Sequence, residues 1–239
     1  MASLAVAASA SAGDSWPTFL PPPSRYSPDE VAAVEKAWKA PTLHRSITGP
    51  PAPMPFEAYL ALVDAPELTA AAARHLRIAQ YEIRKIGPDW YEADDHDGSH
   101  GFYRVLVRQD GRRVTMSWGS RHGPLLGTIR GSALTLLEFE AHGDQTLQRL
   151  ETYVVIDNLI AARLARLLLA TFGPVADRKL AHGFEVTARV AAWATERPGE
   201  FCAWVAQQPV DSDRRHHLLA SLAACRDDRG HPVASSPAR

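Results

Sequence analysis

Hydrophobic and polar side chains alternate in short runs between residues 77 and 156, whereas helical spacing prevails before and after this region. Alternation is typical of half-buried strands, and apolar residues three or four positions apart are typical of amphipathic helices. Asp110-Gly111 and His142-Gly143-Asp144 indicate tight turns, so neighbouring strands should pair antiparallel. The predicted strands are residues 77–86, 89–94, 101–109, 112–118, 125–131, 133–141 and 146–156.

Helices are predicted on both sides of the strands. Ser27-Pro28-Asp29-Glu30 combines a capping box with proline at the first helical position, which predicts a helix from Pro28 to Ala40. Residues 56–76 predict two short helices separated at Asp64-Ala65-Pro66. A long amphipathic helix should follow Asp157, with a break at Gly173-Pro174. Shorter helices are expected at residues 201–206 and 212–225.

Alternation also divides the strand residues between two faces of the sheet. One apolar face is expected to continue across the Asp110-Gly111 turn, and the long helix is expected to lie over it and enclose a cavity. The side chains assigned to this face are Tyr103, Val105, Val107, Val114, Met116 and Trp118.

Composition and charge exclude some classes of protein. The chain has 239 residues, is 46% hydrophobic and has a net charge of −1, as expected of a globular protein. Lys and Arg are scattered, so no nucleic-acid partner is expected. The most apolar segment, residues 159–176, contains Arg163 and Arg166, which argues against a membrane-spanning helix. Cys202 and Cys225 lack metal-ligand spacing and are predicted to be reduced, buried thiols of a cytoplasmic protein.

The order of these elements resembles the START-like superfamily, also called SRPBCC. The resemblance covers Thr42 to Pro198, with "TLHRSIT" (Thr42–Thr48) in the place of the first strand, and no short motif identifies a subfamily. It implies an α+β helix-grip fold, in which an antiparallel sheet of six or seven strands curls around a long C-terminal amphipathic helix. It also implies a cavity that receives a hydrophobic or amphipathic small molecule.

The sequence pattern and this resemblance together suggest how the chain is divided into segments. Residues 1–26 are expected to form a disordered or extended arm, and residues 27–208 a single START-like domain with an extra N-terminal helix. Residues 209–239 are expected to form a C-terminal helix and a disordered tail.

Two polar stretches of the sequence are candidates for a metal site or a catalytic site. Asp94–His100 is rich in Asp and His, but Gly98 and Gly101 prevent the helical spacing of a two-histidine metal face, so a polar turn is favoured. No metal or cofactor is expected. Ser117–Gly123 is predicted to be a loop in which His122 is the candidate catalytic base. An ordinary surface histidine is the favoured alternative.

The residues expected to line the cavity and bind a ligand are Tyr81, Tyr91, Tyr103, Met116, Trp118, Phe139 and Thr152. Arg104, Arg130 and Glu138 are polar candidates if they face the cavity. The favoured function is a carrier or sensor of a hydrophobic or amphipathic small molecule. The alternatives are a cyclase- or dehydratase-type enzyme, which acts on a polyketide-like or isoprenoid substrate by acid/base catalysis, and an interaction module with an exposed apolar patch. The ligand's identity and the oligomeric state are left open.

Overall fold

The computed structural model describes residues 15–123, 127–157 and 181–226. Its centre is an antiparallel seven-stranded sheet with the strand order β1-β7-β6-β5-β4-β3-β2. The strands are β1 (Leu43–Thr48), β2 (Glu82–Gly87), β3 (Trp90–Asp94), β4 (Ser99–Gln109), β5 (Arg112–Gly123), β6 (Gly127–His142) and β7 (Gln145–Ile156). Two short helices separate β1 from β2, and further helices follow β7, which confirms the predicted α+β class.

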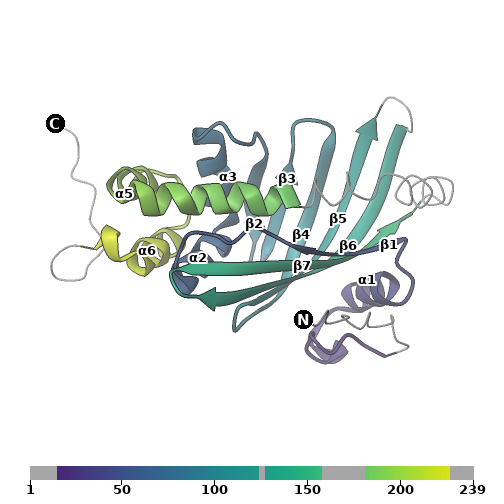
Figure 1. Cartoon of the computed structure of the whole chain (residues 1–239). Helices are drawn as coiled ribbons and strands as arrows, with labels where there is room; N and C mark the ends of the chain where they lie inside the picture. Colours follow the sequence, from purple (N-terminus) through teal and green to yellow (C-terminus); the bar gives the residue numbers. More distant parts are fainter. Residues whose placement is uncertain (1–14, 124–126, 158–180, 227–239) are drawn as a thin grey trace, which may run out of the picture.

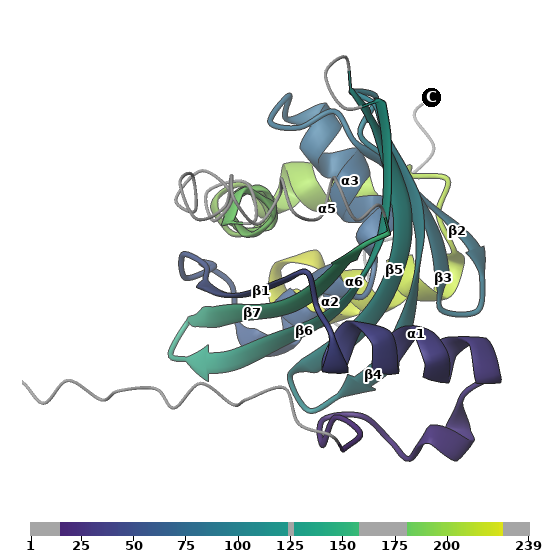
Figure 2. The same cartoon turned by 90° about the vertical axis from the view of Figure 1, so that its right-hand side faces the viewer.

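The sheet is bent, and helices lie on both of its sides (Figures 1 and 2). The helix over residues 181–196 lies inside the bend, whereas α1 lies outside it. This is the predicted helix-grip arrangement. The labelled helices are α1 (Pro28–Lys39), α2 (Phe56–Val63), α3 (Pro66–His75), α5 (Pro198–Ala206) and α6 (Ser212–Ser221), with short 3-10 turns η1 (Pro23–Arg25) and η2 (Ala223–Cys225). The predicted helix start after Asp157 and the Gly173-Pro174 break lie outside the described residues.

A row of glycines accompanies the bend of the sheet. Gly101, Gly119 and Gly131 are neighbours across β4, β5 and β6. A Cβ atom on Gly101 would lie 2.5 Å from the carbonyl oxygen of Trp118, and one on Gly131 would lie 2.5 Å from that of Val155. Because backbone atoms occupy the space of a side chain, only glycine allows the strands to approach in this way.

These glycines do not end the strands, and two sequence predictions are wrong for that reason. Residues 125–131 and 133–141 were predicted as separate strands, yet β6 continues through Gly131. Ser117–Gly123 was predicted as a loop, yet it is the second half of β5 and pairs with β6 as far as Gly123. The long β5–β6 pairing supplies backbone hydrogen bonds that the glycine and serine content of these segments does not reveal.

The predicted continuous apolar face is also wrong. Tyr103 pairs with Ser117, whereas Met116 pairs with Arg104 and Trp118 with Phe102. Directly opposed residues point to the same side of a sheet, so Tyr103 and Met116 lie on opposite faces. We call the face of Tyr103 and Ser117 the inner face, and that of Met116 the outer face. The β4–β5 register shifts between Val105 and Val107, which places Val107 with Val114 on the outer face.

The outer face is covered by α1 and by the chain before it. Val34 and Ala37 of α1 are fully buried in one core with Met116 and Leu134. Leu20, within the predicted arm, joins this core. The inner face packs against α2, α3, α5, α6 and the helix over residues 181–196 in a second core. The apolar alternation in β5 therefore marks the surface that α1 covers.

The predicted capping box is confirmed. The Ser27 hydroxyl accepts a hydrogen bond from the Glu30 amide at 3.4 Å, and the Glu30 carboxylate accepts one from the Ser27 amide at 2.9 Å. Glu30 is buried and also pairs with Arg104 of β4. Burial raises the pKa of Glu30, but the hydrogen bonds from Ser27 and Arg104 together outweigh burial and hold the pKa below its ordinary value.

This lowered pKa makes a pH-dependent contribution to stability. We expect Glu30→Gln to lower the free energy of unfolding at about pH 7 by about 1–2 kcal/mol, through loss of charged hydrogen bonds. A carboxylate with a lowered folded-state pKa stabilises above its ordinary value and loses that contribution as the pH falls, so the variant should lose less stability than the parent between about pH 7 and pH 3. Urea unfolding at both pH values measures this, with the exposed Glu140→Gln as the control. Equal losses in the parent and Glu30→Gln would contradict the assignment.

The two cysteines correct another prediction. Cys202 of α5 and Cys225 of η2 form a disulfide, with their Cα atoms 5.5 Å apart. Reduced thiols were predicted from the apolar surroundings and the lack of metal-ligand spacing, but the turn between α5 and α6 returns the chain to α5 and brings the two cysteines together. The expectation of a cytoplasmic protein rested on reduced thiols and loses that basis. Among the described helices, none is long and apolar enough to span a bilayer.

The predicted division of the chain stays a prediction. Leu218 of α6 is fully buried in the inner core, so the segment after residue 208 contributes to the packing of the domain. Residues 1–14 and 227–239, including the predicted disordered tail, lie outside the described part of the chain.

Candidate ligand cavity

Three adjoining pockets lie along the inner face. Their volumes are about 480, 330 and 230 Å³, and we call them the glycine, arginine and helix pockets. Tyr103 and Ser117 line both the glycine and the arginine pocket. Tyr81 lines both the glycine and the helix pocket, and the helix and arginine pockets share Val63, Pro66, Ile83 and Leu137. The shared residues make the pockets neighbouring compartments of one concave surface.

The glycine pocket rests on the bare backbone of the bend. Its lining includes consecutive residues of three strands, 99–103, 117–121 and 129–133, because side chains are missing at the three glycines. Ala93, Ala133, Val154 and Ile156 supply small apolar side chains around this floor. A flat or bulky apolar group can therefore lie directly against the sheet.

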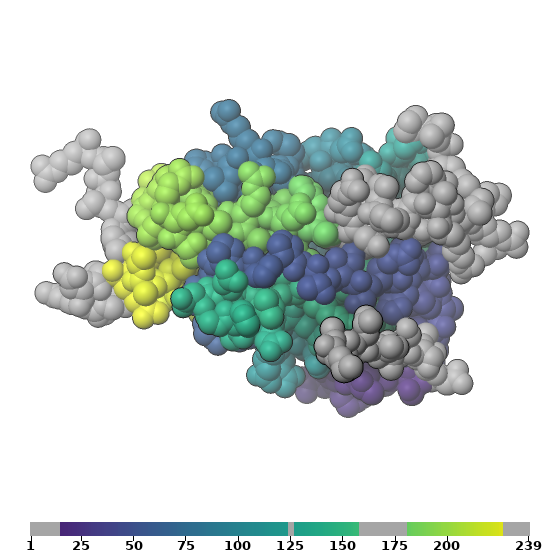
Figure 3. Space-filling model, in the orientation of Figure 1, coloured from purple at the N-terminus to yellow at the C-terminus, as the bar shows by residue number. Residues whose placement is uncertain are grey.

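The helix pocket lies beneath the helix over residues 181–196. Phe184 and Thr187 of this helix face Phe139 and Leu150 of the sheet. The helix runs beside the segment that follows β1 (Figure 3), where a Cβ atom on Gly49 would meet the Phe184 ring at 2.6 Å. This close contact holds the helix against the edge of the sheet.

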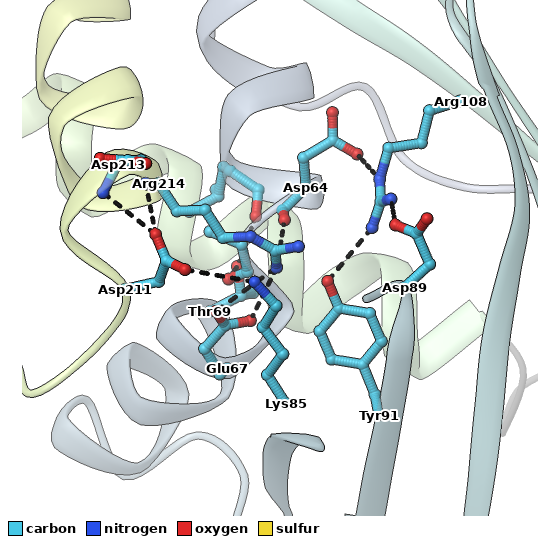
Figure 4. Close-up of polar contacts among 12 residues, drawn as sticks. Asp64, Glu67, Thr69, Lys85, Asp89, Tyr91, Arg108, Asp211, Asp213 and Arg214 are labelled. Atoms are coloured by element: carbon cyan, nitrogen blue, oxygen red, sulfur yellow. Dashed lines mark hydrogen bonds and ion pairs between the residues drawn. The ribbon is translucent and has the colours of Figure 1, made fainter. Parts of the chain in front are cut away.

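The arginine pocket contains a charged network (Figure 4). Arg113 is buried, and its Nε and Nη2 atoms donate to the Asp64 carboxylate at 2.8 and 2.7 Å. Arg108 donates to Asp64 at 3.1 Å, pairs with Asp89 and donates to the Tyr91 hydroxyl at 3.1 Å. The two arginines thus face two carboxylates, and the network has no excess charge.

The C-terminal helix α6 closes this network from one side (Figure 4). Arg214 donates to the Asp64 carbonyl oxygen at 3.1 Å and pairs with Glu67 at 3.4 Å. Its guanidinium lies 5.4 Å from the Tyr91 ring centre, in a cation–π arrangement. Lys85 of β2 pairs with Asp211 at 3.2 Å, immediately before α6. These contacts fix α6 to the inner face at β2 and β3.

Tyrosines occupy the centre of the inner face. The rings of Tyr91 and Tyr103 are stacked, with centres 4.9 Å apart. Burial raises the pKa of Tyr103, with a smaller contribution from Tyr91. The Tyr59 hydroxyl donates to Gln148 at 2.6 Å, and burial raises the pKa of Tyr59. A tyrosine hydroxyl is protonated at neutral pH even at its ordinary pKa, so the Tyr103 hydroxyl can act as a hydrogen-bond donor.

The structure separates the seven residues predicted to bind ligand. Tyr81, Tyr103 and Phe139 line the pockets. Tyr91 and Thr152 belong to the inner face, but both are buried, Tyr91 beneath Tyr103 and Thr152 against Thr135. The other two pack on the outer face: Met116 is fully buried there, and the Trp118 ring stacks on Trp90 even though the residue borders the glycine pocket. Ligand contact stays a prediction for the pocket-lining residues.

The other polar candidates lie away from the pocket centre. Arg104 pairs with Glu30 on the outer face, and Glu138 pairs with Arg112 at 3.3 Å. Arg130 borders the glycine pocket and is exposed. His122 is exposed near the end of β5, where its ring contacts the Thr128 hydroxyl at 3.2 Å. That contact is the local interaction of a surface histidine, and His122 lines none of the three pockets.

Within the predicted Asp94–His100 segment, residues 95–98 form the turn between β3 and β4. The Asp94 carboxylate accepts the His96 amide at 2.7 Å, and the Asp95 carboxylate accepts the Asp97 and Ser99 amides, each at 2.8 Å. His100 lies on β4 and contacts Glu92 at 2.8 Å. The carboxylates thus satisfy the backbone of the turn, as Asx turns do.

Sequence reasoning missed the arginine pocket. Asp64 was assigned only to a helix break, and Arg113 was assigned to the polar side of β5. A buried arginine between Gly111 and Val114 has no local signature, because its partner lies 49 residues earlier in the chain. Thr115 was assigned to the same polar side as Arg113, and Ser117 was assigned to a loop, so neither hydroxyl was predicted to line the cavity.

No protein-family model matches the chain, and no protein of curated function matches its sequence. Solved structures are similar at a low level. A conserved protein from Geobacillus kaustophilus has 16% identity and a TM-score of 0.46, over 63% of this chain and 93% of that protein. Ara h 8.0201 has 12% identity and a TM-score of 0.37, over 63% and 96%. The di-domain ARO/CYC BexL from the BE-7585A biosynthetic pathway has 18% identity and a TM-score of 0.38, over 68% and 55%. These similarities are weak. The strand order and the placement of the helices define the fold, and the activities of these proteins are not assigned to this chain.

Proposed function

We propose that the protein binds a hydrophobic or amphipathic small molecule in the cavity of the inner face, as a carrier or a sensor. The observation that carries this proposal is that three pockets adjoin along the inner face, each sharing lining residues with the other two. The surface that lines them is mainly apolar and includes a few hydroxyl groups and charged side chains, which is the usual composition of a small-molecule site. Apolar contact supplies the affinity, and the hydroxyl groups orient the ligand.

An enzyme of the cyclase or dehydratase type is the second candidate. The observation that favours it is Tyr103, a phenol that lines both the glycine and the arginine pocket. A protonated phenol can polarise a substrate carbonyl group. Incubation with aromatic and isoprenoid ketones, followed by mass spectrometry, distinguishes the two candidates: a carrier returns the ligand unchanged, and an enzyme returns a product.

Filling the glycine pocket should block binding. We expect Ala133→Leu to weaken binding of the uncharged fluorescent probe N-phenyl-1-naphthylamine by about tenfold, because the added side chain takes the space of apolar contacts. Fluorescence titration of folded protein measures the affinity.

Ala141→Leu is the matched control. Ala141 is exposed on the same face of the same strand and lines none of the three pockets. The control should bind the probe as the parent does. Equal affinity in all three proteins would show that the probe binds elsewhere and would contradict the proposed cavity. A mass-spectrometric search for co-purifying small molecules then identifies candidates for the natural ligand.

A further inference from the structure

Hydroxyl side chains gather on the inner face beside Tyr103 and Ser117, the two residues that line both the glycine and the arginine pocket. Thr115, Thr135 and Thr152 are neighbours across β5, β6 and β7 on the inner face. Ser117 follows Thr115 on the same face of β5, two residues further along, and lies opposite Tyr103 of β4. Apolar compartments lie on either side of these hydroxyls: the small side chains over the glycine floor on one side, and Leu137 and Ile83 on the other. A ligand that extends through both compartments places its middle at the hydroxyls.

Some of these hydroxyls are already used by the protein. Thr135 and Thr152 bond to each other at 3.0 Å, and Ser117 donates to the Ala133 carbonyl oxygen at 3.2 Å. In the part of the chain that the structure describes, Tyr103 and Thr115 have no hydrogen-bond partner for their hydroxyls. Both line the arginine pocket. Both residues are partly exposed, so a hydroxyl without a partner in the protein can bond here to a ligand or to water.

The charges nearby limit what that partner can be. Asp64 and Asp89 neutralise the arginines that border these hydroxyls, Arg108 and Arg113. Among the described residues, the two cations that border these hydroxyls already have carboxylate partners, so a carboxylate buried here would have to compete with those pairs. Burial of an unpaired charge is strongly unfavourable. The polar group that fits here is therefore uncharged.

Tyr103 is held so that its hydroxyl serves as a fixed donor. Its ring stacks on Tyr91 with an angle of 13° between the ring planes. The Tyr91 hydroxyl accepts a hydrogen bond from Arg108, which is held by Asp64 and Asp89. The donor therefore loses little conformational freedom when it meets an acceptor.

We propose that this cavity selects apolar ligands with an uncharged hydrogen-bond acceptor, such as a ketone oxygen, near the middle of the molecule, and that the Tyr103 hydroxyl donates to that acceptor. This inference rests on the proposed function and adds a substrate class to it. Thr115 lies on the same side and supplies a second hydroxyl.

Fluorene and 9-fluorenone test the inference, because the two molecules share one shape and differ by a central ketone. We expect the parent to bind fluorenone about fivefold more tightly than fluorene, the effect of one net hydrogen bond. Tyr103→Phe should remove this preference, because it removes the donor that only fluorenone can use. The control is Tyr26→Phe, which removes a buried, unpartnered hydroxyl from the outer side. It should retain the preference. Isothermal titration measures the affinities.

The outcomes separate the inference from the proposed function. Equal binding of both molecules by the parent, or an unchanged preference in Tyr103→Phe, overturns the inference while the cavity stands. Tighter binding of fluorene-9-carboxylate than of fluorenone would overturn the proposal that the ligand's central acceptor is uncharged. If fluorene, fluorenone and N-phenyl-1-naphthylamine all fail to bind the parent, the proposed function fails and the inference fails with it.

Discussion

Loss of the Cys202–Cys225 disulfide should lower the free energy of unfolding by about 3 kcal/mol. The bond closes a loop of 23 residues that contains α6, so it restricts the unfolded chain and keeps α6 beside α5. Leu218 and Leu219 of α6 are buried in the inner core, so its release would also expose apolar surface. The expected fall in melting temperature is about 6–12 °C for a chain of this size. Calorimetry with and without a phosphine reductant measures it.

The control is a double variant, Cys202→Ala with Cys225→Ala. It should unfold at the lower temperature under both conditions, because the reductant has no bond to break. A parent whose melting temperature does not respond to the reductant would contradict the bond's contribution to stability. If the double variant responds as the parent does, the reductant acts elsewhere.

The second large effect is expected at Asp64. Its carboxylate is the partner of Arg113, whose side chain is only 9% exposed, and it also binds Arg108. Asp64→Asn keeps the shape but removes the charge, which leaves a buried guanidinium without its counterion. We expect the free energy of unfolding to fall by about 3 kcal/mol. Urea unfolding at neutral pH measures the change.

Asp97→Asn is the matched control. Asp97 also pairs with an arginine, Arg121, at 3.2 Å, but its side chain is 84% exposed. Exposed ion pairs contribute little, so this variant should unfold as the parent does. Equal effects at the two positions would mean that burial of Arg113 does not decide the strength of its pair. A double variant, Asp64→Asn with Arg113→Met, should recover part of the lost stability, because it removes the unpaired charge.

The position of the cavity follows from the strand pairing. The alternation of side chains and the tight turn were predicted correctly for β4 and β5. The bulge between Val105 and Val107 shifts the pairing, so Tyr103 and Val105 of β4 lie opposite Ser117 and Thr115 and not on the face of Met116. A shift of one residue reverses every side chain of a strand. Two residues of the predicted ligand set, Met116 and Trp118, therefore pack with the outer core.

Local features of the sequence determined the kind and order of the elements. The capping box at Ser27, the break at Pro66 and the Asp110-Gly111 turn act within a few residues, so their effects can be recognised without knowledge of the fold. Alternation of hydrophobic and polar residues then identifies the strands, and apolar residues three or four positions apart identify the helices. The order of the elements followed from these features, and the resemblance of that order to the START-like superfamily then implied the helix-grip fold.

Only the tertiary structure decided which face holds the cavity and which residues meet there. The face depends on strand register and on α1, which covers the more apolar side of β5. The disulfide joins residues 23 apart, the Asp64–Arg113 pair joins residues 49 apart, and Arg214 meets Asp64 across 150 residues. These pairings depend on the path of the whole chain, and the physical reason is that no local preference of either partner specifies the other.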